Sequence, residues 1–191
     1  MQKLSKLTSI GVISAVAAFA GSARPLHAAD NDTGKTKTEE RGQFSAKDYK
    51  FVREAAEGGL LEVKLGELAK QKGTSQSVQQ FGDRMVTDHT KANNDLKQIV
   101  SQKGAMLPDQ LSRKEEHELM HFQKLSGKDF DKNYAEHMVK DHNKDIKEFQ
   151  DAAKNAQDPE LKAFAQKTLP VLEQHMQQAQ QIESSLKEAT P

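Results

Sequence analysis

The chain has 191 residues, of which 29% are charged and 5% are aromatic, and its 28 basic residues balance its 28 acidic ones. This length suits one domain, and the balanced charge argues against a nucleic-acid partner, which would require a clustered basic face. Cysteine is absent, so disulfides, a thiol nucleophile and thiolate metal ligands are excluded.

The N-terminal segment, residues 1–29, predicts a secretory signal peptide. Lys3 and Lys6 provide a basic start, residues 7–20 form an apolar run, and small residues lead up to Ala29. The apolar run is shorter than the roughly 20 residues that cross a bilayer as a helix. We therefore expect cleavage near Ala29, no integral membrane segment afterwards, and a periplasmic or secreted protein. An uncleaved N-terminal anchor is the alternative.

The rest of the chain divides into a linker and a helical domain. Residues 30–44 are polar, with Gly, Thr and Lys, and predict a flexible linker. Residues 45–188 are rich in Ala, Leu, Lys, Glu and Gln and show no alternating strand pattern. This composition predicts an all-α domain.

Capping residues mark five helices in that domain. Ser45 predicts the first start, with Asp48 as its capping-box partner, and Gly73 predicts the end. The remaining helices are expected from Ser75 to about Lys103, from Ser112 to about Leu125, from Ser126 through Phe149, and from Asp158-Pro159 through Leu186.

The lengths of the connections predict how the helices are arranged. The first two long helices are joined by a short turn, and so are the last two, whereas a long connection with the short helix lies between the pairs. Two antiparallel hairpins joined by one crossover describe a ferritin-like four-helix bundle. An up-and-down bundle is the alternative.

Three glycines inside the first helix require an explanation, because glycine costs about 1 kcal/mol there relative to alanine. Gly58, Gly59 and Gly66 lie within one helical stretch. Close approach of a neighbouring helix is one reason for them. The other is that Gly58 and Gly66 lie about one turn on either side of Glu62 and leave space around its carboxylate.

Polar residues interrupt the apolar faces of the long helices. Apolar and small residues recur at steps of three and four, which places them on one side of each helix. Glu62, His89, His142 and His175 lie in these core-facing positions, one on each long helix. The run Met-Val-x-Asp-His occurs at residues 85–89 and again at 138–142, so that Asp88 and Asp141 each precede one of the histidines.

Several longer motifs resemble domain-of-unknown-function family 4142 (DUF4142), whose members are often labelled outer-membrane proteins. They are FVREAAEGGLLEVKLGELA at 51–69, MVTDHTKAN at 85–93, LSGKDFD at 125–131, YAEHMVKDH at 134–142 and LPVLEQH at 169–175. The resemblance covers roughly residues 46–188. It implies a ferritin-like bundle in an exported bacterial protein, and it brings no established reaction.

The first candidate site consists of Glu62, His89, His142 and His175, with Asp88 and Asp141 as further ligands or as residues that orient the imidazoles. Inward carboxylates and imidazoles on facing helices form metal sites in helical bundles, and these ligands suit iron, manganese or zinc. A standard di-iron site is not expected, because the second and fifth helices lack Glu-x-x-His. The alternative is a buried hydrogen-bonded network that only sets packing.

The second candidate is His117-Glu118-Leu119-Met120-His121, which matches the His-Glu-x-x-His helix of zinc proteases. The third histidine of the metzincin motif is missing, since Lys124 and Gly127 follow without it, and no strand is predicted to hold a substrate. Leu119, Phe122 and Leu125 define the apolar face, so the two histidines point away from it. Two solvated surface histidines are the alternative.

These observations predict an exported helical-bundle protein that binds a divalent metal in its core, and they assign no catalytic residue. The alternative is a non-enzymatic structural or stress-related envelope protein whose buried His, Asp and Glu side chains form a packing network. A homo-oligomer or an envelope partner is compatible with both.

Overall fold

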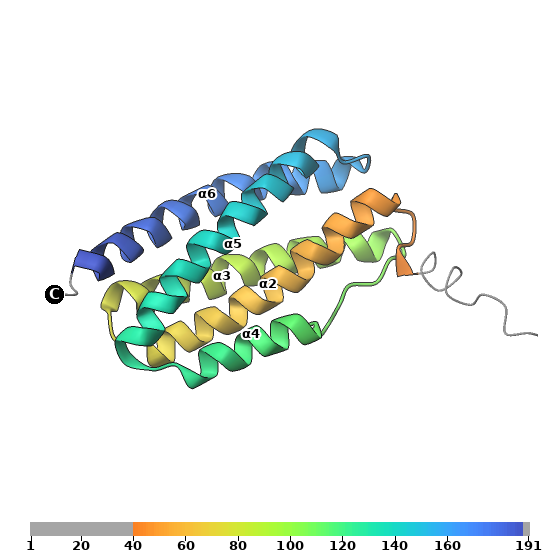
Figure 1. The fold of residues 1–191 in the computed structure, drawn as a ribbon. Coiled ribbons are helices and arrows are strands. Elements are labelled where there is room, and N and C mark those ends of the chain that lie inside the picture. The colour runs from red at the N-terminus through yellow and green to blue at the C-terminus, as the bar shows by residue number, and fades with distance from the viewer. Residues whose placement is uncertain (1–39, 189–191) are drawn as a thin grey trace, which may run out of the picture. The chain divides into compact units, whose positions relative to one another are not determined.

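A computed structural model describes residues 40–188, and every regular element in this range is a helix. Figure 1 shows the five helices, which are α2 (Ala46–Lys72), α3 (Gln76–Gln102), α4 (Arg113–Lys124), α5 (Gly127–Asn155) and α6 (Pro159–Glu188). The prediction of an all-α fold is confirmed. None of the described helices is long and apolar enough to cross a membrane.

The four long helices pack along their lengths. α2 packs against α3 and α5 packs against α6, with further contacts between α3 and α6 and between α2 and α5. The connection after α3 and the short α4 run back along the bundle, so that α3 and α5 point in the same direction (Figure 1). The two Met-Val-x-Asp-His runs therefore lie on parallel helices.

Two of the predicted caps are present as expected. Ser112 and Glu115 form a capping box at the start of α4, with both reciprocal hydrogen bonds made. Asp158 accepts hydrogen bonds from the backbone N–H groups of Glu160 and Leu161 at the start of α6. These bonds satisfy N–H groups that have no partner within the helix.

The capping box predicted at Ser45 is only half formed. The Ser45 hydroxyl accepts a hydrogen bond from the Asp48 backbone N–H, but the Asp48 carboxylate does not return to Ser45. It accepts instead from the backbone N–H groups of Gln157 and Asp158, at 2.9–3.2 Å, in the turn between α5 and α6. Asp48 therefore ties the start of α2 to a turn distant in the sequence.

Asp131 makes the equivalent connection at the other end of the bundle. Its carboxylate accepts from the backbone N–H groups of Thr74 and Ser75 at 2.8–3.1 Å and from the Thr74 hydroxyl at 2.6 Å. This aspartate is 1% exposed. Ser75, the expected cap of α3, makes no side-chain capping bond, and Asp131 instead binds the two residues that precede the helix. Ser126, at the start of α5, also makes no side-chain capping bond.

The core consists of two apolar clusters at different heights along the bundle. One contains Phe51, Val52, Leu96, Phe149, Leu161 and Phe164 among its members, and the other contains Leu65, Phe81, Met85, Phe130, Tyr134 and Met138. His89, His142 and His175 fall between the two sets of residues on their helices, and Glu62 lies next to Leu61, where the second cluster begins on α2. We call these four residues the polar layer.

The helical glycines have different roles. A Cβ on Gly66 would lie 2.8 Å from the Gly82 carbonyl oxygen, and one on Gly59 would lie 2.2 Å from the Asn93 side chain. Close approach of α3 therefore explains these two glycines. A Cβ on Gly58 would meet nothing within 4 Å, and Gly58 borders a cavity of about 20 Å³ together with Glu62 and Asp145.

The predicted signal peptide and residues 30–39 of the predicted linker lie outside the described residues. The last part of the linker range packs against the domain. Phe44 is 4% exposed within the first apolar cluster, and Gln43 donates its backbone N–H to the Lys103 carbonyl at 3.0 Å. Gly42 has a φ of 53°, and a Cβ there would clash with the Lys103 carbonyl oxygen.

Replacing Asp131 by asparagine should lower the free energy of unfolding by about 2 kcal/mol, because hydrogen bonds to a charged acceptor are lost in a buried site. Urea denaturation measures this change. Asp129→Asn is the matched control, because Asp129 lies on the same turn of α5 and is exposed. Equal effects of the two substitutions would contradict a specific role for Asp131 in holding the α2–α3 turn.

Candidate metal centre

The polar layer is removed from solvent. Glu62 is 1% exposed, His89 is 6% exposed, and both His142 and His175 are 0% exposed. Each residue comes from a different long helix, so the structure brings together all four residues that the sequence predicted. Unpaired polar groups at such positions would cost several kcal/mol. The partners of each ring nitrogen therefore indicate whether the layer is a hydrogen-bonded network or a metal site.

Each imidazole uses one nitrogen to contact a fixed acceptor. His89 Nδ1 lies 2.8 Å from Glu62 Oε2. His142 Nδ1 lies 3.1 Å from the carbonyl oxygen of Met138, one turn earlier on α5. His175 Nε2 lies 2.8 Å from Asp88 Oδ2. A carbonyl oxygen and an ionised carboxylate can only accept, so each of these ring nitrogens carries the hydrogen when Glu62 and Asp88 are ionised.

The other three ring nitrogens are consequently bare in neutral imidazoles. They are His89 Nε2, His142 Nε2 and His175 Nδ1. His89 Nε2 is buried and has no hydrogen-bond partner, whereas His142 Nε2 and His175 Nδ1 face each other at 3.4 Å. Because every neutral imidazole has already used its hydrogen, no hydrogen remains for that last contact. A shared cation or an added proton would satisfy these three lone pairs.

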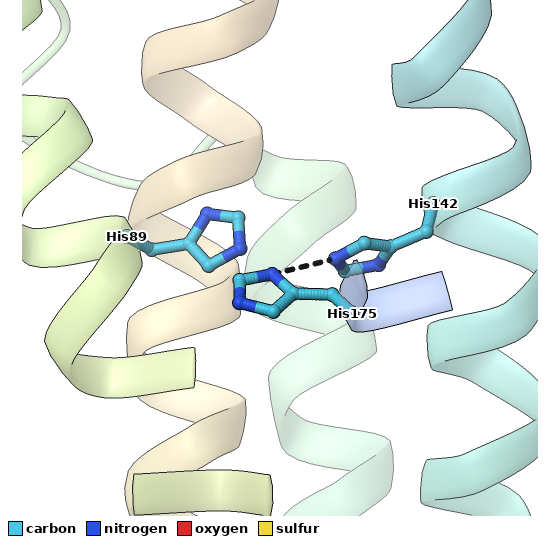
Figure 2. A group of neighbouring side chains, drawn as sticks. All are labelled: His89, His142 and His175. Atoms are coloured by element: carbon cyan, nitrogen blue, oxygen red, sulfur yellow. Dashed lines mark hydrogen bonds between the residues drawn. The ribbon is translucent and has the colours of Figure 1, made fainter. Parts of the chain in front are cut away.

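The distances suit a shared metal ion. The three histidines each offer a nitrogen, and these atoms all lie within 4.8 Å of one another. Figure 2 shows the three rings turned toward one another, with ring centroids 5.3–5.8 Å apart. Two nitrogens bound about 2.0–2.1 Å from one tetrahedral zinc ion would lie roughly 3.4 Å apart, which is the separation between His142 and His175.

The local electrostatics disfavour an added proton on any of the three imidazoles. Burial lowers the pKa of His89 to about 4 and, with the charge of His89, lowers the pKa of His175 to about 4. Burial also lowers the pKa of His142 well below its usual value. At neutral pH the imidazoles are therefore neutral, which is the form that binds metals.

Asp88 connects the buried layer to the surface. Burial by itself would raise its pKa, but the hydrogen bonds from His175 and Arg84 and the positive charge of Arg84 outweigh this effect and lower the pKa of Asp88. The Arg84 guanidinium donates to Asp88 at 3.3 Å and also reaches Gln174 and Gln178 on α6. Asp88 thus lies between a partly exposed arginine and a fully buried imidazole, where it orients the ring.

Asp141 occupies a different position, although it is the counterpart of Asp88 in the repeated motif. One of its oxygens lies within 4.8 Å of one oxygen each from Glu62 and Asp145. Burial and then the charge of Asp141 raise the pKa of Glu62 well above its usual value. Burial and the charges of Glu62 and Asp141 raise the pKa of Asp145 in the same way.

Two groups in this region, Asp145 and the Met138 carbonyl, were not predicted from the sequence. Asp145 lies one helical turn after Asp141, so the shared face of α5 was visible from the spacing. The spacing along α5 could not show that the Glu62 carboxylate of α2 faces these two aspartates.

The family model described as "Domain of unknown function (DUF4142)" matches residues 33–182. The chain belongs to the DUF4142 family. No match was found among curated proteins.

A solved structure shows the same kind of fold. It is a crystal structure of a DUF305 fragment from Deinococcus radiodurans, which is 11% identical to this DUF4142 chain with a TM-score of 0.64. The match covers 76% of this chain and 98% of the fragment. At this identity the likeness concerns the fold alone.

The His-Glu-x-x-His run of this DUF4142 chain lies on α4. His117 and His121 are exposed, and Glu118 lies 3.1 Å from His137 Nδ1 on α5. Neither His117 nor His121 belongs to a group of three potential metal ligands within the described residues. The two histidines therefore occupy the solvated positions that the helical pattern indicated.

The unfolding free energy of chelator-treated protein should fall as the pH is lowered from about 6.5 to 4. A group with a lowered folded pKa contributes stability above its unfolded pKa and loses it as the pH falls, which applies to His89, His142 and His175. The raised pKa values of Glu62 and Asp145 act in the opposite direction, but the histidines outnumber them.

Urea denaturation across this pH range tests the prediction. Glu62→Gln removes one opposing carboxyl group and should make the pH dependence steeper. A free energy of unfolding that stays constant or increases toward pH 4 would show that the histidines are not buried in their neutral form.

Proposed function

We propose that the protein binds a divalent metal ion between its helices through His89 Nε2, His142 Nε2 and His175 Nδ1. The observation that carries this proposal is the convergence of three buried ring nitrogens with no hydrogen left to share. Imidazole ligands suit zinc, and they also suit iron. Of the ions considered from the sequence, zinc fits the 3.4 Å nitrogen separation well.

In this proposal Glu62, the Met138 carbonyl and Asp88 do not bind the metal. Each accepts the hydrogen of the opposite ring nitrogen, which fixes the tautomer and the direction of the lone pair. Of the two roles predicted for Asp88, this proposal gives it that of orienting an imidazole. A metal with three protein ligands keeps a further position for water or another small ligand.

We propose that the four long helices form a ferritin-like bundle. The support is the pairing of α2 with α3 and of α5 with α6, together with a long connection that makes α3 and α5 parallel. Metal sites in such bundles lie between facing helices. The present ligand set differs from the carboxylate-rich di-iron pattern because three imidazoles form it.

The alternative function is structural, with the polar layer serving only to fix the packing of an envelope protein. Hydrogen bonds from His89 and His175 to carboxylates favour a network of this kind. A network without a metal leaves His89 Nε2 unpaired, so it accounts for fewer of the observed contacts. The two functions differ in whether removing a metal changes stability.

We also propose that the protein acts outside the cytoplasm. The basic, apolar and small-residue segments of residues 1–29 support removal of a signal peptide near Ala29. N-terminal sequencing of the protein recovered from the periplasm tests this. A mature chain that retains residues 1–29 would contradict it.

Untagged protein should bind about one Co²⁺ or Zn²⁺ per chain, and Co²⁺ should produce visible d–d absorption typical of nitrogen ligands. At a metal concentration of about 100 times Kd, binding should add roughly 2.7 kcal/mol to stability. His142→Gln should abolish the absorption, whereas His117→Gln, on the exposed face of α4, should leave it unchanged. Equal metal binding by wild type and His142→Gln would overturn the proposal and favour the structural alternative.

Asp88→Asn should weaken Co²⁺ binding by roughly 10- to 100-fold while keeping the shape of the absorption spectrum, because the ligands remain and only the orientation of His175 is lost. Asp83→Asn is the matched control, since Asp83 is exposed on the same helix and pairs with Lys70. A changed spectrum in Asp88→Asn would show that Asp88 is a direct ligand.

A further inference from the structure

A group of three carboxylates lies beside the histidines and is not explained by them. Glu62, Asp141 and Asp145 each offer an oxygen, and these oxygens lie within 4.8 Å of one another. Glu62 comes from α2, whereas the two aspartates lie one turn apart on α5. Like charges brought together in this way repel one another, more strongly in a buried site than in water.

The repeated Met-Val-x-Asp-His motif allows the partners of its two aspartates to be compared. On α3 the motif aspartate, Asp88, faces an imidazole N–H of α6 and forms a hydrogen bond of 2.8 Å. On α5 the motif aspartate, Asp141, instead faces the carboxylate of Glu62 on α2. A hydrogen-bond donor therefore stands opposite the first aspartate, and a second acceptor stands opposite the other.

The positive charge near this group is too small to neutralise three carboxylates. Lys144 is the nearest cation, with its Nζ atom 3.7 Å from Asp145. This lysine side chain is 56% exposed and also pairs with Glu148 at 3.3 Å. No hydrogen bond within residues 40–188 reaches the carboxylate of Asp141 or of Asp145, so a single shared lysine is left to offset three acids.

The Glu62 carboxylate supplies a second, independent sign of a missing partner. Its Oε2 atom accepts from His89, but its Oε1 atom is buried without any hydrogen-bond partner. The cavity of about 20 Å³ bordered by Gly58, Glu62 and Asp145 adjoins this carboxylate. This volume exceeds the roughly 10–15 Å³ that one water requires, so a water ligand fits beside the carboxylates.

We propose that Glu62, Asp141 and Asp145 hold a hard divalent cation at a second site next to the three histidines. Its oxygen ligands are of the kind that Mn²⁺, Mg²⁺ and Ca²⁺ prefer. The two sites share Glu62 through different atoms, because Oε2 orients His89 and Oε1 binds the cation. The second site needs no metal on the histidines.

Mn²⁺ binding monitored by electron paramagnetic resonance tests the second site, with one equivalent of Zn²⁺ added first to occupy the histidines. Wild type should bind about one further Mn²⁺. Asp145→Asn should weaken this binding roughly tenfold or more, because the charge of the ligands sets the affinity of such sites. Asp151→Asn, on the same helix and paired only with Lys47 and Asn155, should leave it unchanged.

The two sites are separated by their response to substitution. Asp145→Asn should retain the Co²⁺ absorption of the histidine site, and its helical circular dichroism should match wild type. His142→Gln should lose the Co²⁺ absorption but still bind Mn²⁺ without added Zn²⁺. Equal Mn²⁺ affinity in wild type and Asp145→Asn would overturn the second site, as would loss of Mn²⁺ binding in Asp151→Asn or in His142→Gln.

Discussion

The structure depends on the burial of three imidazoles and one carboxylate at a single level of the helical core. Buried polar groups are tolerated only when their hydrogen-bonding capacity is used. Each ring meets this requirement at one nitrogen, through Glu62, Asp88 or a helix carbonyl. These bonds join α2 to α3 and α3 to α6, so that displacing one helix along its axis would break contacts made by its neighbours.

Two further aspartates, at the two ends of the bundle, also oppose displacement of the helices along their axes. Asp48 holds the α5–α6 turn, and Asp131 holds the α2–α3 turn. Apolar contacts between helices are not directional, so they set the distance between helices better than their relative height. The polar layer and the two aspartates supply the directional contacts that place the ring nitrogens within a few ångströms of one another.

The repeated motif leads to two different environments within one layer. Asp88 and Asp141 occupy the same place in their helices, but one faces an imidazole and the other faces a carboxylate. The difference arises from α2 and α6, which bring Glu62 to one side and His175 to the other. A nearly symmetric pair of helices thus produces a nitrogen-rich group and an oxygen-rich group, which suit cations of different chemistry.

Local sequence patterns were sufficient to predict the helices, several of their ends and the residues of the polar layer. These features depend on neighbours within a few positions, as in the capping box of Ser112 and Glu115 and in the three-and-four spacing that turns His89 inward. The repeat also identified Asp88 and Asp141 as residues beside the core.

The contacts between these groups depend on how the helices pack and could not be predicted from local patterns. Asp48 was expected to complete a local cap, but a turn more than a hundred residues away offers two N–H groups instead. The roles of Asp131 and Asp145, and the pairing of Asp88 with His175, likewise depend on the relative heights of helices that are distant in the sequence. Periodicity specifies the face on which a side chain lies, whereas the packing of all four helices sets its height and its partner.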